Sequence, residues 1–152
     1  LGVGRTFGFK AINDPRFTAT VDTDLGAKVA AVCAALQSHD MVFIHIKAPD
    51  ICSHDLNPRG KRDFLQRLDA ALEPLLVTGA IIAVAADHTT DSNSGAHTAD
   101  PVPALICHPG SSQGTRMVNF GETACRQGNM ERQLSNEFLL KALQMMHSPL
   151  SS

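Results

Sequence analysis

Two short apolar runs separated by an amphipathic stretch constrain the fold of this chain more than any other feature. Residues 41–47 (MVFIHIK) are rich in β-forming side chains, and residues 80–86 (AIIAVAA) are apolar throughout. Such runs are typical of buried strands in parallel sheets, which helices cover on both faces. Residues 58–77 lie between the runs and repeat apolar side chains at helical spacing. The pattern therefore predicts a strand–helix–strand unit.

Further elements of the same two kinds flank this unit. Thr23 and Asp24 can cap a helix that runs to about Gln37, and residues 102–107 predict a third, shorter strand. Strands that alternate with helices predict an α/β fold with a mostly parallel open sheet flanked by helices.

The last third of the chain predicts a loop and one more helix. Residues 110–114 (GSSQG) have the composition of a loop. Ser135 can cap the final helix, and Leu134 and Leu139 are spaced as a hydrophobic staple across its first turn.

Size and composition narrow the classes of protein to which the chain can belong. Of its 152 residues, 43% are hydrophobic, which suits one domain or a large piece of one. The net charge of −2 with well-mixed charges argues against a nucleic-acid partner. No apolar run reaches the roughly 20 residues that cross a bilayer, so we expect no membrane partner. The four cysteines form no C-x-x-C pair, so we expect free thiols and a cytoplasmic location.

Five side chains of metal-ligand type follow the apolar runs. Asp50 and His54 come after the first run, Asp87 and His88 come directly after the second, and His97 precedes the third predicted strand. Ligands of open α/β sheets collect beyond the carboxyl ends of the strands, so we expect all five at one edge if the strands are parallel neighbours. Each residue alone would be a turn, cap or surface group. Together their oxygen and nitrogen donors suit zinc or manganese, and a pair of such ions can clamp a phosphoryl group.

Three nearby residues are weaker candidates. Lys47 ends the first run at the same edge, where it could contact a phosphate as a point charge or simply be a solvated lysine. Cys52 could be a soft ligand, but a bystander thiol is the better interpretation because oxygen and nitrogen donors suffice. His45 lies inside a predicted strand, and we expect a core or cleft histidine there rather than a ligand.

Three motifs around these residues resemble one known family. Residues 45–55 (HIKAPDICSHD), 85–90 (AADHTT) and 97–103 (HTADPVP) are similar to the C-terminal part of archaeal-type cofactor-independent phosphoglycerate mutases. That family belongs to the alkaline phosphatase superfamily, and some members are labelled phosphonopyruvate decarboxylase-like. Each motif alone is weak, but their order and spacing are specific together.

The resemblance implies a function and a division of the ligands. Asp50, His54 and His97 would hold one divalent ion, and Asp87 and His88 would hold the other. The ions would be manganese or zinc, with magnesium or cobalt as alternatives. The substrate would be phosphoglycerate, whose phosphoryl group this glycolytic isomerase moves between the 3- and 2-positions through a phosphoserine.

The resemblance also implies that part of the enzyme has no counterpart here. The family's nucleophilic serine and a further aspartate ligand belong to an N-terminal segment, and no stretch of this chain resembles it or the inserted substrate-binding domain. We therefore expect residues 1–152 to form the C-terminal portion of the metal-binding domain, without a catalytic residue and without activity in isolation. A phosphatase, a phosphonopyruvate decarboxylase-like relative and a non-catalytic metal-binding fragment are the alternatives. A truncated sheet would expose an edge that favours a homo-oligomer.

Overall fold

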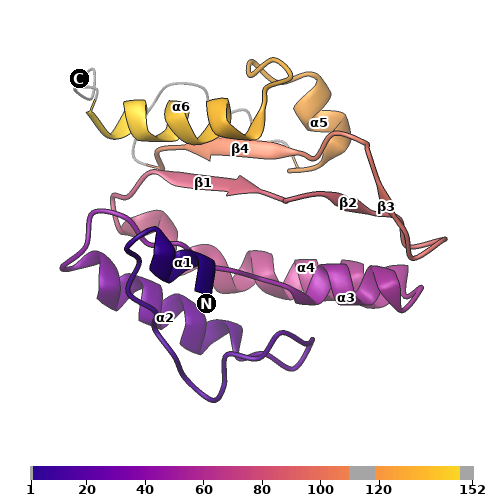
Figure 1. The fold of residues 1–152 in the computed structure, drawn as a ribbon, viewed down its shortest axis with the longest axis horizontal. Helices are drawn as coiled ribbons and strands as arrows, with labels where there is room; N and C mark the ends of the chain where they lie inside the picture. The colour runs from indigo at the N-terminus through magenta and orange to yellow at the C-terminus, as the bar shows by residue number, and fades with distance from the viewer. Residues whose placement is uncertain (1, 110–118, 148–152) are drawn as a thin grey trace.

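The computed structural model describes residues 2–109 and 119–147, and within them helices alternate with short strands in an α/β fold. Figure 1 shows β1 and β4 side by side, with α6 along one side of this pair and α2 and α4 on the other. The expected loop at residues 110–114 lies outside the described residues. The elements are α1 (Gly2–Thr6), α2 (Leu25–Leu36), α3 (Ala48–His54), α4 (Pro58–Leu72), η1 (Glu73–Val77), β1 (Ile82–Ala85), β2 (Thr89–Thr90), β3 (His97–Thr98), β4 (Ala104–Cys107), α5 (Glu122–Arg126) and α6 (Ser135–His147).

Two of the predicted helices form from local capping signals. The Asp24 carboxylate accepts a hydrogen bond from the backbone N–H of Ala27 at 2.8 Å, which confirms the predicted start of α2. Asn57 caps α4 in the same way. The predicted single helix over residues 58–77 is wrong at its end. Because Pro74 has no N–H to continue the α-helical ladder, the chain continues as the 3-10 helix η1.

A small core joins these helices to the segment before α3. Phe64 of α4 is 1% exposed and packs with Leu25 of α2 and with Ala48. A second cluster is formed by Val29, Val32 and Leu75, and the partly buried residues packed against it include Val42, Ile44 and Ile82. The core therefore fixes α3, whose first residue is Ala48, against α2 and α4.

The predicted strand over residues 41–47 does not form a ladder within the described ranges. Its side chains alternate as a strand requires, because Val42, Ile44 and Ile46 are partly buried while Phe43 and His45 are exposed. The expectation of a fully buried strand is therefore wrong, and so is that of a core or cleft position for His45. The pattern identified an extended segment with one inward face, but a strand also needs a hydrogen-bonded neighbour.

The two ladders of the described residues are antiparallel, whereas we predicted mostly parallel pairing. β1 pairs with β4 from Ile82↔Cys107 to Ala85↔Ala104, and β2 pairs with β3. The route from β1 to β4 runs through the short β2–β3 ladder and contains no helix, while parallel pairing needs a long crossover. β1 is also half exposed rather than covered on both faces.

The start of α6 differs from the prediction by one position. The Leu134 N–H donates to the Glu137 carboxylate at 2.8 Å, so Leu134 and not Ser135 lies at the cap. Leu134 and Leu139 are both exposed, and the predicted staple is therefore wrong. The glutamate supplies the stabilising contact that we had assigned to the serine and the two leucines.

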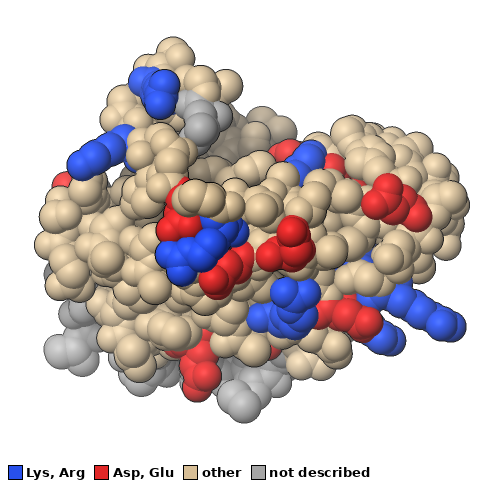
Figure 2. Space-filling model, turned by 90° about the horizontal axis from the view of Figure 1, so that it is seen from below, with Lys and Arg blue, Asp and Glu red and all other residues tan. Residues whose placement is uncertain are grey.

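Charges on the surface are mixed in sign. Figure 2 shows Lys and Arg interspersed with Asp and Glu on the face seen from below, with wide uncharged areas between them. None of the helices in the described ranges is both long and apolar enough to span a membrane.

The core predicts a large effect of one substitution. Phe64→Ala should lower the free energy of unfolding by about 3–5 kcal/mol, because it removes a buried ring and leaves a cavity. Urea denaturation measures this loss. Leu65→Ala, on the 44% exposed neighbour, is the matched control and should cost much less. An equal loss in both variants would contradict the assigned core.

Candidate metal centre

The helix α3 brings the first two candidate ligands together. Asp50 and His54 are four residues apart, so they lie on the same side of the helix one turn apart. The Asp50 Oδ1 atom is 3.5 Å from His54 Nε2. This helix was not among the predicted elements, although Pro49 in its first turn and the four-residue spacing of Asp50 and His54 indicate one.

His97 completes a cluster of three donors. Its Nε2 atom lies 3.2 Å from His54 Nε2 and 3.8 Å from Asp50 Oδ1. One ligand atom from each residue lies within 4.8 Å of the others. A carboxylate oxygen and two imidazole nitrogens, all facing one point, fit a zinc- or manganese-type ion. This test of the donor set supports the predicted first metal site.

The connection between β2 and β3 orients His54. His54 Nδ1 lies 2.8 Å from the carbonyl oxygen of Gly95. A carbonyl only accepts, so Nδ1 carries the hydrogen, and Nε2 of the neutral ring directs its lone pair toward the cluster, where His97 Nε2 lies 3.2 Å away. Gly95 has a φ of 70°, and a Cβ there would lie 3.2 Å from the His54 carbonyl oxygen. Glycine is therefore required for both the turn and the close approach.

The Asp91 carboxylate stabilises the same connection. It accepts hydrogen bonds from the backbone N–H of Asn93 and from the Ser94 hydroxyl, and these contacts lower the pKa of Asp91. The Asp91 carbonyl accepts from the Gly95 N–H at 2.7 Å. Local hydrogen bonds thus fix the turn that carries the Gly95 carbonyl to His54.

Asp50 is held by two donors. Lys47 Nζ lies 2.7 Å from its Oδ2, and the Thr90 hydroxyl donates to its Oδ1 at 2.6 Å. Burial raises the pKa of Asp50, but the hydrogen bonds from Lys47 and Thr90 outweigh burial and lower it to about 2. The hydrogen bond with Asp50 in turn raises the pKa of Lys47. The carboxylate is therefore charged at neutral pH.

Asp87 and His88 follow β1 and lie beside this cluster. The His88 ring stacks on the His97 ring with centroids 3.8 Å apart and an interplanar angle of 33°. The Asp87 side chain is 80% exposed, and its Oδ2 lies 3.4 Å from His88 Nε2. The structure thus brings all five predicted residues to one region of the molecule. Asp50, His54 and His97 form the three-donor cluster, and Asp87 and His88 lie beside it.

Comparison with known proteins identifies the family. The sequence model of the Metalloenzyme superfamily matches residues 11–139. The chain belongs to this superfamily.

Archaeal proteins similar to this chain cover most of its length. It is 40% identical to the 2,3-bisphosphoglycerate-independent phosphoglycerate mutase of Methanoculleus marisnigri over 86% of this chain and 32% of that protein. It is 36% identical to enzyme 1 of that name from Archaeoglobus fulgidus over 96% of this chain and 36% of that protein. The chain thus spans about a third of the length of these relatives. These matches confirm the resemblance that the three motifs predicted.

A solved structure shares the fold of this chain. The PH0037 protein from Pyrococcus horikoshii matches with a TM-score of 0.88 and 28% identity, over 96% of this chain and 45% of that chain. The α/β architecture is therefore shared with a longer protein.

Two residues that support the three-donor cluster were not predicted from the sequence. They are Thr90, which contacts Asp50, and Gly95, which orients His54. Their position in the sequence, between the candidate ligands Asp87 and His97, could have indicated that they lie near the site. Cys52 is buried and does not belong to the three-donor cluster, as the bystander interpretation predicts. The four cysteines are free thiols.

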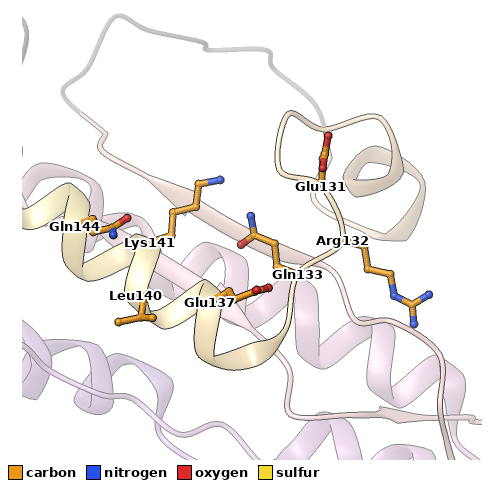
Figure 3. Close-up of a pocket in the computed structure, with 7 residues that line it drawn as sticks. All are labelled: Glu131, Arg132, Gln133, Glu137, Leu140, Lys141 and Gln144. Carbon is orange, nitrogen blue, oxygen red and sulfur yellow. The ribbon is translucent and has the colours of Figure 1, made fainter.

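A surface depression of about 460 Å³ lies away from these residues. Figure 3 shows it between residues 131–133 and α6, where Glu137 and Lys141 line it. None of its lining residues is a candidate ligand. The metal-ligand side chains therefore indicate that the candidate site is the three-donor cluster and not this depression.

The low pKa of Asp50 predicts a pH-dependent contribution to stability. Its folded pKa of about 2 lies below the ordinary value of about 3.9, so the contribution is complete above about pH 4 and is lost as pH falls toward 2. Asp50→Asn should therefore be less stable than wild type at neutral pH, with a gap that narrows in acid. Denaturation at several pH values measures this gap. A gap independent of pH would contradict the electrostatic assignment.

Proposed function

We propose that this chain is part of a metal-dependent phosphotransferase that interconverts 2- and 3-phosphoglycerate. The observation that carries the proposal is the cluster of Asp50, His54 and His97, with His88 stacked against it. This cluster occurs in a chain similar to archaeal 2,3-bisphosphoglycerate-independent phosphoglycerate mutases. As a glycolytic enzyme, the protein would be cytoplasmic.

Each of the five residues has a role in this proposal. Asp50, His54 and His97 hold one divalent ion, while Asp87 and His88 contribute to a second. Bound ions would supply Lewis-acid stabilisation of the charge that develops on a transferring phosphoryl group. Manganese or zinc fits the mixed donors best, with magnesium or cobalt as alternatives.

Lys47 is the proposed phosphate contact at this edge. Its ammonium pairs with Asp50, and the Asp87 charge also raises its pKa. The side chain is more than a third exposed, so a phosphate could approach its free donors.

The chain provides no nucleophile for a phosphoserine among its described serines near the site. Ser53 is fully buried, and its hydroxyl contacts the Pro49 carbonyl and the Ser92 hydroxyl. We therefore propose that the nucleophile and the substrate-binding domain belong to the portion of the relatives that this chain does not cover. Residues 1–152 would form the C-terminal portion of the metal-binding domain and would be inactive alone.

One observation favours a second candidate function. All three donors for the first ion lie within this chain, so it can act as a metal-binding fragment without catalysis. A phosphatase or a phosphonopyruvate decarboxylase-like relative would share the same metal residues. Activity on phosphomonoesters and phosphonates separates these enzymes from the mutase.

Metal binding tests the site directly. Titration of the 152-residue chain with Mn²⁺ or Zn²⁺ should show binding that His54→Ala weakens at least about 10-fold, because the variant loses a ligand. His39→Ala is the matched control, since His39 is exposed and its ring hydrogen-bonds with Ser38 and the Ala35 carbonyl, neither of which is a candidate ligand. Equal metal content in both variants would contradict the site.

Activity tests the whole proposal. The intact protein that contains this chain should interconvert 2- and 3-phosphoglycerate with Mn²⁺ and without added 2,3-bisphosphoglycerate, and the 152-residue chain alone should not. A coupled assay measures both reactions. Absence of mutase activity in the intact protein with metal bound would contradict the proposal, as would turnover by the 152-residue chain.

A further inference from the structure

The hydroxyl of Thr90 lies where the two sets of candidate ligands meet. Thr90 is 5% exposed, and its Oγ1 is 2.6 Å from Asp50 Oδ1 and 3.3 Å from His88 Nδ1. Under the proposed function, Asp50 belongs to one ion and His88 to the other. A single buried hydroxyl therefore contacts a ligand from each set.

Counting hydrogens fixes the direction of both contacts. A hydroxyl carries one hydrogen, and an ionised carboxylate only accepts, so Thr90 donates to Asp50. The contact with His88 can then be a hydrogen bond only if His88 Nδ1–H donates to the Thr90 oxygen. In the neutral ring this leaves His88 Nε2 without a hydrogen, so Nε2 and the Asp87 Oδ2 atom 3.4 Å away are two acceptors close enough to share a cation.

Neighbouring elements hold Thr90 in place for this role. Its carbonyl accepts a hydrogen bond from Lys61 Nζ of α4 at 3.4 Å. Across the β2–β3 ladder its partner is His97, the third ligand of the first set. The backbone of Thr90 is thus held from two sides. The direction of its hydroxyl is set by Asp50 Oδ1, which accepts from it, and by His88 Nδ1, which donates to it.

We propose that Thr90 is a positioning residue shared by both metal positions, and this inference rests on the proposed function. Its hydroxyl fixes Asp50 Oδ1 for the first ion and selects the His88 tautomer whose Nε2 is free for the second. Thr90 would act through Asp50 and His88 and not as a ligand itself.

The tautomer of His88 tests the inference without any metal. Long-range proton–nitrogen NMR spectra of the metal-free chain at about pH 8, where an ordinary imidazole is neutral, should show His88 protonated at Nδ1. Thr90→Val, which keeps the shape but removes the hydroxyl, should shift the population toward Nε2–H, and Thr90→Ser should restore the wild-type tautomer. Wild-type His88 protonated at Nε2 would overturn the proposal, and this outcome does not depend on whether any variant folds.

Mn²⁺ titration supplies a second readout. Thr90→Val should weaken Mn²⁺ binding about 10–100-fold, as loss of a residue that orients ligands does, and Thr90→Ser should restore it. Thr89→Val is the matched control, because the Thr89 hydroxyl donates only to the Asp100 carbonyl, and it should bind as wild type does. Wild-type affinity in Thr90→Val would overturn the inference while leaving the proposed function intact. If wild type bound no Mn²⁺, the proposed function would fail, and the tautomer would still decide the role of Thr90.

Discussion

The arrangement of the chain segments around the candidate site depends on the contacts of one carboxylate. Asp50 is mostly buried, and an ionised carboxylate in that position is costly unless donors surround it. Those donors come from different parts of the chain: Lys47 ends the extended segment, and Thr90 belongs to β2. The same contacts that keep Asp50 charged therefore hold α3, the extended segment and the β2–β3 ladder together, so the site forms only where these elements meet.

Two helix starts were predicted well, because the start of α2 at its Asp24 cap and the start of α4 follow from capping and periodicity. Asp50 and His97 lie together as expected, but the expected reason was wrong, because the strands near them pair antiparallel and not parallel. Strand pairing was predicted poorly because it depends on which segments become neighbours. The alternation of apolar side chains in residues 41–47 indicates which side chains point inward, but it does not indicate whether another strand pairs with this segment.

The residues that orient the candidate ligands could not be predicted from the sequence for a similar reason. A threonine or a glycine has no metal chemistry of its own, and its importance appears only when the chain brings it to a ligand. Thr90 matters because Asp50 and His88 both face its hydroxyl, and Gly95 matters because its carbonyl meets His54. Ligand types can be read from a sequence, whereas the groups that orient them require the assembled structure.

The sequence spacing of the three clustered ligands links metal binding to the docking of the β2–β3 segment onto α3. Asp50 and His54 meet within one turn of α3, whereas His97 approaches from 43 residues away. Closing that loop costs chain entropy, and the contacts of Thr90 with Asp50 and of Gly95 with His54 act against this cost. An ion bound by all three residues would contribute its binding free energy to this closure. The divalent ion would thus stabilise the docking of the β2–β3 ladder onto α3. The docked fraction would then increase with the concentration of free metal.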